Sequence, residues 1–468
     1  MKYDYDLIAI GGGTAGLTAT TAAVGFGLSA ALIEKHRIGG DCTWTGCVPS
    51  KALIRAARAA HETRTAARFG ILVEPPRVDM AAVRAHVRAS IETIYQHETP
   101  DALGKQGVTV IPGTARFIDP RTIQVGERRL TARRFLITTG ASPIIPAIAG
   151  LADVPYHTYE TIFDLETLPA SLAIVGAGSV GTELAQAYQR LGAQVTLIGE
   201  TLLPKADADA RAVLETVFAR EGVLRIRASA DRVSRDGDRI VVHAGAERVS
   251  ADVLLIAVGR APTVQGLDLE AAGVAYSADG ITVDTYLRTN QRHIYAAGDC
   301  IGRAQYTHYA GWAAFRALQN AFLPVKVKTD AAQVPWTVFT DPEVAQVGMS
   351  EAAARAEYGD KVGVQLMPMD RTDRAITDGA IDGFIKVIHT GSARVVGAVV
   401  VAPRAGEVIN EFALALDHEP NALNLAGTIH TYPTYSTAAQ LAEAAIVTRW
   451  MLNGMIGRIV RWAARRGR

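Results

Sequence analysis

The sequence predicts an α/β fold with two Rossmann-like units and a C-terminal α+β region, and three observations carry this prediction. Residues 5–23, YDLIAIGGGTAGLTATTAA, read as a buried strand, a glycine turn and a small-residue helix. Residues 171–200, SLAIVGAGSVGTELAQAYQRLGAQVTLIGE, repeat that order. From about residue 335 the pattern changes to helical segments around FIKVIHTGSARVVGAVVVAP, which predicts a strand hairpin in a separate domain.

The bulk composition is that of a globular chain with about three domains, at roughly 150 residues per domain. Of the 468 residues, 49% are hydrophobic and 20% are charged, and the formal net charge of +1 gives no general reason to expect nucleic-acid or membrane binding. The N-terminus runs straight into a strand pattern without a signal peptide. With only three cysteines and no apolar run of about 18 residues, we expect a cytoplasmic, reducing setting.

Both repeats contain the pattern G-x-G-x-x-G, at Gly11, Gly13, Gly16 and at Gly176, Gly178, Gly181. In such a unit the first glycine makes a tight turn, the second lets a pyrophosphate approach, and the third packs helix against strand. Glu34 ends the next strand, 18 residues after Gly16, where an acidic residue binds a ribose hydroxyl. One such motif is equally compatible with an ordinary glycine-rich turn. Two complete strand–turn–helix units predict two bound dinucleotides.

Three further strands end in glycine turns, in RFLITTGASPIIP, DVLLIAVGRAP and HIYAAGDCIG. Asp299 stands just past the third of these strands. From the pattern alone, this carboxylate is either a partner for a bound cofactor or a helix cap.

The stretch GGDCTWTGCVPSK, residues 39–51, places Cys42 and Cys47 five positions apart. A zinc site is disfavoured because the spacing is C-x-x-x-x-C and no second pair follows. Residues five apart on a regular helix lie about 7.5 Å apart along the axis and about 140° around it. A disulfide needs Cα atoms within about 7 Å, so one cysteine must lie in an irregular turn before a helix that we expect from Lys51 onward. A thiol near a helix start is stabilised as a thiolate, which favours a reactive pair.

Two dinucleotide units and a reactive thiol pair suggest an electron relay from nicotinamide to flavin to disulfide. At this point the chain resembles the FAD-dependent class I pyridine nucleotide–disulfide oxidoreductases, the family of glutathione reductase, dihydrolipoamide dehydrogenase and mercuric reductase. The match covers nearly the whole chain, through both glycine motifs, CTWTGCVPSK, TTGASP, VGRAP, AAGDC and TDPEVAQVG. The resemblance implies a homodimer whose chain divides into an FAD-binding domain in two parts (1–150 and 281–334), an NAD(P)H-binding domain (151–280) and a dimerisation domain (335–468).

The resemblance also implies roles for single residues. Cys47 matches the charge-transfer thiol beside the flavin, and Cys42 the interchange thiol that meets the substrate. Lys51 and Glu183 match an ion pair near the flavin and nicotinamide, and Tyr95 matches a substrate-face tyrosine. Implied cofactor contacts are Gly11, Gly13, Gly16, Glu34, Lys35, Gly40, Asp41, Thr139, Gly140, Asp299, Gly176, Gly178, Gly181, Glu200 and Gly259. No resident metal is expected, and Cys300 is interpreted as a buried small hydrophobe.

Near the C-terminus the chain departs from the disulfide reductases of this family, which carry a histidine before a proline and a glutamate five residues on. Here the residue before Pro433 is Tyr432, and Thr437 stands five past it, so both members of the acid–base pair are missing. General acid–base catalysis contributes typically about 10²- to 10⁴-fold, so efficient reduction of lipoamide or glutathione disulfide is not expected. His430 and His97 are the candidate substitutes. A surface or packing role is favoured for His430, whereas His97 is equally compatible with an exposed position at a helix end.

Mercuric reductases resemble this chain in carrying tyrosine at that position, and Tyr432 would complete the partner's site. Reduction of a soft metal ion needs two thiolates as ligands and no protonated leaving thiol. The chain ends RWAARRGR, without the C-terminal cysteine pair of mercuric reductases, and lacks the N-terminal metal-binding domain that many of them carry. Direct delivery of Hg(II) from small thiols is therefore expected, and the chain is interpreted as mercuric reductase-like.

The sequence thus predicts an enzyme that passes electrons from NAD(P)H through FAD and a redox-active Cys42–Cys47 disulfide to a soft metal ion or thiol-bound electrophile. The alternative is a disulfide reductase of the dihydrolipoamide dehydrogenase or glutathione reductase type with a substitute acid–base. An alternative of another class is a redox-sensing or metal-sequestering flavoprotein with little turnover. Lys51, Glu183 and the second nucleotide motif disfavour it, because a sink needs no nicotinamide site.

Two finer predictions concern the nicotinamide and the tail. NADH is predicted over NADPH because Glu200, beside Gly199 in the usual acidic slot, would repel a 2′-phosphate, and only Lys205 stands nearby to attract one. The C-terminal segment NGMIGRIVRWAARRGR is basic and amphipathic. We interpret it as a solvated helix end rather than a helix lying on an anionic membrane.

Overall fold

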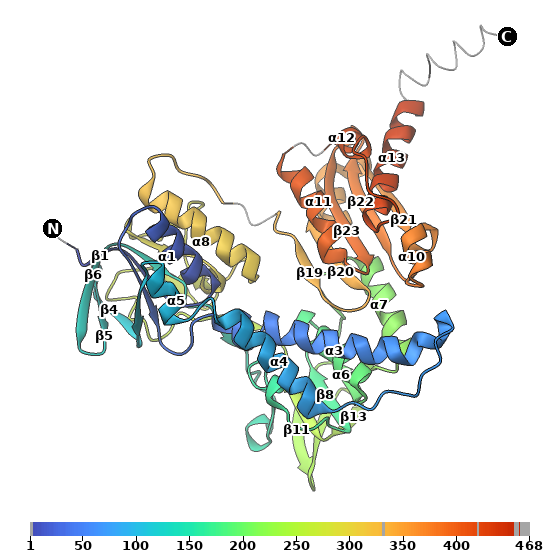
Figure 1. The fold of residues 1–468 in the computed structure, drawn as a ribbon, viewed down its shortest axis with the longest axis horizontal. Coiled ribbons are helices and arrows are strands. Elements are labelled where there is room, and N and C mark those ends of the chain that lie inside the picture. Colours follow the sequence, from blue (N-terminus) through green and yellow to red (C-terminus); the bar gives the residue numbers. More distant parts are fainter. Residues whose placement is uncertain (1–2, 330–332, 419–420, 454–457, 459–468) are drawn as a thin grey trace. The chain divides into compact units, whose positions relative to one another are not determined.

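The structure is a computed structural model that describes residues 3–329, 333–418, 421–453 and 458 (Figure 1). The chain forms two compact units, one made of Met1–Glu200 with Val223–Ala331 and the other of Thr201–Gly222 with Ala332–Arg468. Within the described ranges no helix is long and apolar enough to cross a membrane. The expected division into three domains, one of them in two parts, and the expected cytoplasmic setting stay predictions. Apart from Asn453 and Arg458, the basic tail lies outside the described residues.

The first unit contains a sheet in which β6 is the central strand. The strands run β3-β2-β1-β6-β5-β4, and β18 also pairs with β6. They are β1 (Tyr5–Ile10), β2 (Ala30–Glu34), β3 (Thr109–Pro112), β4 (Ala115–Asp119), β5 (Thr122–Val125), β6 (Arg128–Ile137) and β18 (Ile294–Ala296). β1, β2, β3, β18 and β6 pair in parallel, while β4 and β5 extend β6 as an antiparallel meander. The continuous apolar runs of β1 and β2 fit parallel strands covered on both faces.

Some of the helices in this part of the unit cover the sheet, and others carry the cysteine motif away from it. They are α1 (Thr14–Gly25), α2 (Gly40–Trp44), α3 (Cys47–Thr65), α4 (Met80–Tyr95), α5 (Pro100–Lys105) and α8 (Thr307–Phe322). α1 begins at the first glycine turn and lies beside α8 (Figure 1). Small residues of α1 such as Ala19 and Ala23 are fully buried, which lets the helices approach closely.

The second predicted unit forms a parallel sheet with the order β10-β9-β8-β14. Its elements are β8 (Ser171–Val175), α6 (Ser179–Leu191), β9 (Gln194–Ile198), β10 (Leu224–Ile226) and β14 (Val253–Ile256). An antiparallel sheet packs against it, made of β11 (Ala230–Asp236), β12 (Arg239–Ala244) and β13 (Glu247–Ala251). Short pairs join β7 (Ala141–Pro143) to β15 (Arg260–Pro262), and β16 (Tyr276–Ser277) to β17 (Gly280–Ile281). Both strand–turn–helix units predicted from the glycine motifs are confirmed.

The second compact unit is an antiparallel sheet with helices. The strands run β19-β20-β23-β22-β21. They are β19 (Trp336–Val338), β20 (Glu343–Gly348), β21 (Val362–Pro368), β22 (Phe384–Thr390) and β23 (Val395–Ala402). The helices are α7 (Ala208–Glu221), α9 (Glu351–Tyr358), α10 (Asp373–Thr377), α11 (Ala405–Asp417), α12 (Ala422–Ala426) and α13 (Ser436–Asn453). The hairpin predicted around TGSAR is confirmed as β22 and β23.

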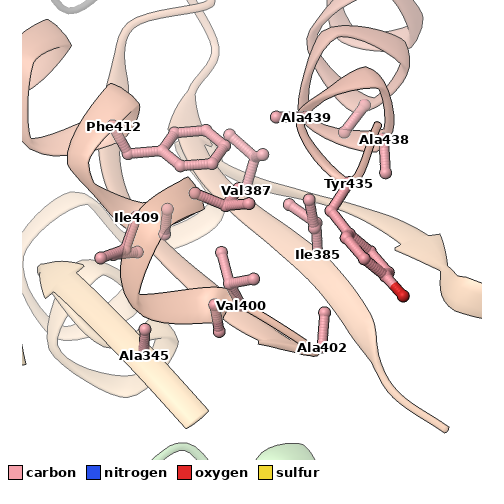
Figure 2. Close-up of a cluster of buried hydrophobic side chains, with 14 of the residues drawn as sticks. Ala345, Ile385, Val387, Val400, Ala402, Ile409, Phe412, Tyr435, Ala438 and Ala439 are labelled. Atoms are coloured by element: carbon pink, nitrogen blue, oxygen red, sulfur yellow. The ribbon is translucent and has the colours of Figure 1, made fainter. Parts of the chain in front are cut away.

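The core of this unit lies between the sheet and helices α11 and α13. Every residue of β23 is buried, so the strand reads as one apolar run, VVGAVVVA. Figure 2 shows Val387 and Val400 of the sheet together with Phe412 of α11 and Ala439 of α13. This packing fixes the loop that precedes α13, where Tyr432 lies.

Candidate active site

The first glycine turn forms a backbone cradle with one open position. Gly11 has φ +113°, and a Cβ there would lie 2.3 Å from the Thr138 carbonyl oxygen. A Cβ on Gly16 would lie 2.0 Å from the Gly11 carbonyl oxygen. At Gly13, by contrast, the nearest atom to a Cβ is 3.9 Å away, on Gly40. The turn and the helix packing therefore require glycine at the first and third positions, and the second leaves room for a pyrophosphate at the start of α1.

The second glycine turn has the same construction. Gly176 has φ +115°, and a Cβ there would lie 2.3 Å from the Ala257 carbonyl oxygen. A Cβ on Gly181 would stand 1.9 Å from the Gly176 oxygen, whereas one on Gly178 would have nothing within 4 Å. The residues present therefore fit two dinucleotides, one against each turn.

Two carboxylates stand at the ends of the strands that follow these turns. Glu34 accepts hydrogen bonds from the backbone N–H of Gly12 at 2.6 Å and of His36 at 2.7 Å. Glu200 accepts one from the Ser229 hydroxyl at 2.9 Å. Both side chains are thereby held at the edge where a ribose would lie. Lys35, next to Glu34, is exposed.

The structure corrects one detail of the nicotinamide prediction. The guanidinium of Arg225 donates to the carbonyl oxygens of Leu197 at 2.8 Å and Gly199 at 3.2 Å, at the end of β9. The expectation that only Lys205 brings positive charge to this place is therefore wrong. The sequence alone does not reveal that Arg225 lies at this place, because β10, which carries it, is paired with β9 only in the folded sheet.

The remaining predicted cofactor residues lie on loops at the carboxyl ends of strands or in α2. Gly40 has φ +59°, and a Cβ there would come within 2.9 Å of the Gly13 Cα, so the cysteine loop touches the first glycine turn. Thr139 donates its hydroxyl to the Thr263 carbonyl at 2.6 Å, and Gly140 follows it with φ +71°. Gly259 has φ +138° and precedes β15.

The two cysteines lie on neighbouring helices. Cys42 is in the short helix α2, and Cys47 is the first residue of α3. The expected helix start at Lys51 is wrong by one turn, because Pro49 is tolerated in the first turn of a helix, where its missing N–H costs nothing. The Cys42 and Cys47 thiols lie close enough for Cys42 to hydrogen-bond to the Cys47 sulfur.

The two thiols have opposite proton affinities. The hydrogen bond from Cys42 lowers the pKa of Cys47 to about 6, and the Thr307 hydroxyl and Lys51 add to this against the effects of burial and Glu183. The same hydrogen bond, with burial, raises the pKa of Cys42 far above its ordinary range. At neutral pH Cys47 is therefore the thiolate and Cys42 the thiol.

One contact and one nearby positive charge support the Cys47 thiolate. The Thr307 hydroxyl, at the first residue of α8, lies 3.2 Å from the Cys47 sulfur. Lys51, one turn along α3, places its Nζ 2.9 Å from Glu183 Oε2 on α6. The Glu183 side chain is only 7% exposed, so this ion pair is held inside the unit. The two residues that the resemblance paired are thus brought together.

Arg260 joins two of the predicted cofactor residues, and the sequence reading missed it. Its guanidinium lies 2.6 Å from Asp41 Oδ2 on one side and 2.6 Å from Asp299 Oδ2 on the other. The Tyr159 hydroxyl donates to the same Asp41 oxygen at 3.0 Å. Burial raises the pKa of Asp299, and Arg260 opposes that rise. The arginine of VGRAP was a visible signal, but its partners are distant in sequence.

Glu98 is a second residue that sequence reasoning missed. Its carboxylate accepts a hydrogen bond from Thr43 at 2.9 Å, beside Cys42, and burial raises its pKa. Tyr95 packs its ring edge-on against Trp44, with the centroids 4.8 Å apart. His97 is exposed. The substrate-facing role of Tyr95 and the proton-transfer role of His97 stay predictions.

In the second compact unit, Tyr432 is 67% exposed and its hydroxyl donates to Asp373 Oδ2 at 2.6 Å. His430 bonds to Glu411 through Nε2 and contacts the Thr428 carbonyl through Nδ1. Its side chain is only 7% exposed, so this histidine is packed inside its own chain. The Thr437 hydroxyl lies 3.3 Å from the Thr431 carbonyl oxygen. A threonine has no carboxylate, so Thr437 does not replace the family's glutamate.

Cys300 is fully buried, and its thiol lies 3.3 Å from the Ala297 carbonyl oxygen. Burial raises its pKa to about 12. The interpretation as a buried small hydrophobe is confirmed. Within the described residues, no cluster of histidine, cysteine and carboxylate side chains is able to hold a metal ion.

Two dinucleotide cradles beside a thiolate–thiol pair define a redox enzyme that uses two nucleotide cofactors. Residues 5–314 match the sequence profile of the pyridine nucleotide-disulphide oxidoreductases, and residues 334–443 match their dimerisation domain. The chain is 38% identical to a mercuric reductase from Shigella flexneri over 449 residues, 92% of this chain and 79% of that relative. It is 34% identical to a dihydrolipoyl dehydrogenase from Thermus scotoductus over 455 residues, 94% of this chain and 97% of the other.

A solved structure also resembles the chain closely. The Cu(II) complex of the HOCl-induced flavoprotein disulfide reductase RclA from Escherichia coli matches with a TM-score of 0.83 at 27% identity. The match covers 92% of this chain and 98% of that one.

This protein belongs to the pyridine nucleotide–disulphide oxidoreductases, in class I. It is an FAD-dependent enzyme that uses NAD(P)H, and its C-terminal part is the dimerisation domain of that family. The predicted family, fold class, enzyme class and cofactor pair are confirmed.

Proposed function

We propose that the enzyme passes electrons from NAD(P)H through FAD and the Cys42–Cys47 pair to a soft metal ion such as Hg(II), or to a thiol-bound electrophile. The observation that carries the proposal is the pair of neighbouring thiols, with Cys42 in α2, Cys47 at the start of α3 and the Thr307 hydroxyl 3.2 Å from the Cys47 sulfur. Their mutual hydrogen bond lowers the pKa of Cys47 to about 6 and raises the pKa of Cys42. Sulfur ligands are the ones that soft metal ions prefer. The mercuric reductase relatives support the same substrate class.

The overall reaction balances without a further reactant. NAD(P)H gives up a hydride, Hg(II) takes the two electrons to become Hg(0), and one proton is released. When bound, FAD supplies the two-electron passage between the nicotinamide and the thiol pair. The turn at Gly13 with Asp299 would hold FAD, and the turn at Gly178 with Glu200 would hold the nicotinamide dinucleotide.

The chain's own residues set the ionisation of the pair. Lys51 and Thr307 favour the thiolate on Cys47, and the buried Glu183 holds Lys51 in place. Cys47 would be the thiol on the side of the bound flavin, and Cys42 would be the thiol that meets the substrate. A homodimer is proposed in which Tyr432 of each chain completes the thiol site of its partner, in the reducing cytoplasm.

NADH is proposed as the preferred nicotinamide. Glu200 is held by Ser229 at the end of the strand that binds the adenosine ribose, so its charge would repel a 2′-phosphate. Arg225 offsets part of that negative charge, but two of its N–H groups already donate hydrogen bonds to backbone carbonyl oxygens. A higher kcat/KM with NADPH than with NADH would contradict this proposal.

One observation favours a second candidate function, disulfide reduction. His430 and Glu411 form a histidine–carboxylate pair, which is the kind of pair that protonates a leaving thiol. Both ring nitrogens of His430 are engaged within the chain, however, and the ring is nearly buried. We therefore rank disulfide reduction second.

The test is anaerobic NADH oxidation by the purified flavoprotein with a Hg(II)–thiol complex, lipoamide and glutathione disulfide in parallel. We expect turnover with mercury and little with the disulfides. Turnover with a disulfide that is lost in His430→Ala would instead establish the second candidate. Rapid flavin reduction without turnover of any acceptor would indicate a redox sensor or a metal sink.

A further inference from the structure

We propose that Glu98 is the positioning residue for Cys42, and that its contact with Thr43 sets part of the reduction potential of the Cys42–Cys47 pair. Through this contact Glu98 holds the short helix α2, so that the Cys42 sulfur stays within bonding reach of Cys47. The inference rests on the proposed redox role of the pair. It adds to the site a residue that lies outside the cysteine motif.

The helix that carries Cys42 is too short to hold itself in place. α2 has five residues, Gly40–Trp44, and isolated helices shorter than about 12 residues are marginally stable in water. It begins after Gly39, which has φ +101°, and it ends at Thr45, whose backbone is not helical. The direction in which Cys42 points therefore depends on contacts between α2 and the rest of its unit.

Side-chain contacts hold α2 on both sides of Cys42. Asp41 Oδ2 lies 2.6 Å from the Arg260 guanidinium. Thr43 donates its hydroxyl to Glu98 Oε2 at 2.9 Å. Successive helical residues are about 100° apart, so Asp41 and Thr43 leave the axis about 200° apart, with Cys42 between them. The two contacts together oppose a rotation of α2 about its own axis, which would turn the Cys42 sulfur away.

Glu98 is itself fixed at the turn between α4 and α5. Its N–H donates to the Tyr95 carbonyl oxygen at 2.8 Å, and the next residue, Thr99, caps α5. A Cβ on Gly39 would lie 2.6 Å from Glu98 Oε2, so the carboxylate packs directly against the start of α2. Thr43 is only 2% exposed, so removal of Glu98 would leave its hydroxyl buried without an acceptor.

The contact bears on the reduction potential through the effective concentration of one thiol at the other. Two groups held in a fixed geometry react as if each were present at a high concentration, and a disulfide is stabilised accordingly. When α2 is free to move, that effective concentration falls, and the dithiol becomes favoured over the disulfide. Loss of the Glu98 contact should therefore make the pair easier to reduce.

The exchange that reports the potential balances in atoms and electrons. One molecule of reduced dithiothreitol gives two electrons and two protons to the Cys42–Cys47 disulfide. The S–S bond of the protein breaks, and an S–S bond forms within the dithiothreitol ring. No other reactant takes part.

The test is this equilibrium in the holoenzyme, measured anaerobically at one pH in mixtures of reduced and oxidised dithiothreitol without NAD(P)H. The fraction of disulfide is read by alkylation of the free thiols and mass spectrometry. We expect Glu98→Ala to lower the equilibrium constant for disulfide formation about 10-fold, which raises the potential by about 30 mV. Thr43→Val should do the same. The double variant should be shifted no further, because each single change already removes the whole contact.

Two further variants separate position from charge and from composition. Glu98→Gln removes the charge but keeps an oxygen that accepts from Thr43, so its potential should stay close to that of the wild type. Thr45→Val makes the same chemical change as Thr43→Val on the same loop. The Thr45 hydroxyl has no hydrogen-bond partner among the described residues, so this control should leave the potential unchanged.

An unshifted or lowered potential in Glu98→Ala would overturn the inference. Equal shifts in Glu98→Gln and Glu98→Ala would also overturn it, because the effect would then come from the charge. If Glu98→Ala does not fold, the nearly isosteric Thr43→Val decides the same question. A wild-type pair that forms its disulfide in an enzyme that turns over no soft metal ion would refute the proposed acceptor, while the potentials still decide the role of Glu98.

Discussion

Lys51 Nζ and Glu183 Oε2 lie 2.9 Å apart although the residues are 132 positions apart in the sequence, and their contact joins α3 to α6. The two charges act on the Cys47 thiol in opposite directions. The hydrogen bond from Cys42 is the main cause that lowers the pKa of Cys47 to about 6, and to this Lys51 adds a smaller lowering and Glu183 a smaller raising effect. The ion pair therefore tunes how much Cys47 thiolate is present near neutral pH.

Substitutions at these two positions should shift the thiolate titration with opposite signs. Lys51→Met removes the positive charge and should raise the pKa of Cys47, whereas Glu183→Gln should lower it. The measurement is a pH titration of the thiolate absorbance in the reduced holoenzyme. Arg55→Met, which removes an exposed ion pair with Glu62 on the same helix, is the control and should leave the titration in place. Shifts of the same sign in both variants would contradict this account.

Two glycines of one turn should respond differently to the same added methyl group. Gly181→Ala places a Cβ 1.9 Å from the Gly176 carbonyl oxygen. It should destabilise the fold, because the backbone can move away from the added methyl group only at a large cost in free energy. Gly178→Ala meets open space and should leave the melting temperature nearly unchanged while weakening nicotinamide binding by about 10-fold or more. Thermal unfolding and NADH titration of both variants distinguish these effects. Equal melting temperatures for the two would argue against the packing role of Gly181.

Removal of the Arg260 guanidinium should leave two carboxylates without their cationic partner. Arg260→Met leaves Asp41 and the largely buried Asp299 facing each other without their cation. We expect a loss of about 3 kcal/mol in the free energy of unfolding, at the low end for a buried ion pair since Asp41 is partly exposed. Urea unfolding at pH 7 measures it. Adding Asp41→Asn to Arg260→Met should restore part of the loss, and a further loss instead would refute the electrostatic cause.

Glu443 should make the stability of its unit depend on pH. The residue is fully buried in α13, neither carboxyl oxygen has a hydrogen-bond partner among the described residues, and burial with the nearby Glu411 raises its pKa to about 9. The unfolded chain, with an ordinary glutamate pKa, binds fewer protons between pH 4.5 and 9 than the folded one. The contribution is therefore fully present below about pH 4.5 and declines as pH rises, by about 1.4 kcal/mol per pH unit.

Glu443→Gln should remove this slope. Between pH 5 and pH 7.5 the free energy of unfolding of the wild type should fall by about 3 kcal/mol from this residue, and that of the variant should not. Urea unfolding at the two pH values tests it. Glu407→Gln, an exposed change on α11, serves as the control. An unchanged slope in Glu443→Gln would show that the carboxyl is ionised or solvated in the folded protein.

The local features of the site were predictable because their signals are contiguous. Each glycine motif spans six residues between a strand and a helix, and Cys42, Cys47 and Lys51 lie within one short stretch. The resemblance added the pairing of Lys51 with Glu183, which no local pattern contains. The start of α3 was misplaced by one turn because Pro49, which sits in the first turn, hides the helical pattern there.

Residues that act through long-range contacts were missed for a physical reason. Arg260 meets Asp41 across 219 positions, and Glu98 meets Thr43 across 55. Asp373 contacts Tyr432 only because the packed core of β21, β22 and α13 brings α10 to the loop before α13. Arginine, aspartate and glutamate are mostly exposed residues, so none of these positions stands out in the sequence by type.

The bridge through Arg260 also bears on how the enzyme is made. A ribosome adds about 5 to 20 residues per second, so roughly 10 to 45 seconds separate the synthesis of the cysteine loop from that of its ionic partner. Asp41 has neither of its partners until Tyr159 is added 118 residues later, it lacks Arg260 for the whole interval, and the Thr307 that steadies Cys47 does not yet exist. The nascent thiols are thus ordinary cysteines, and their reactivity arises only when the later part of the chain folds back.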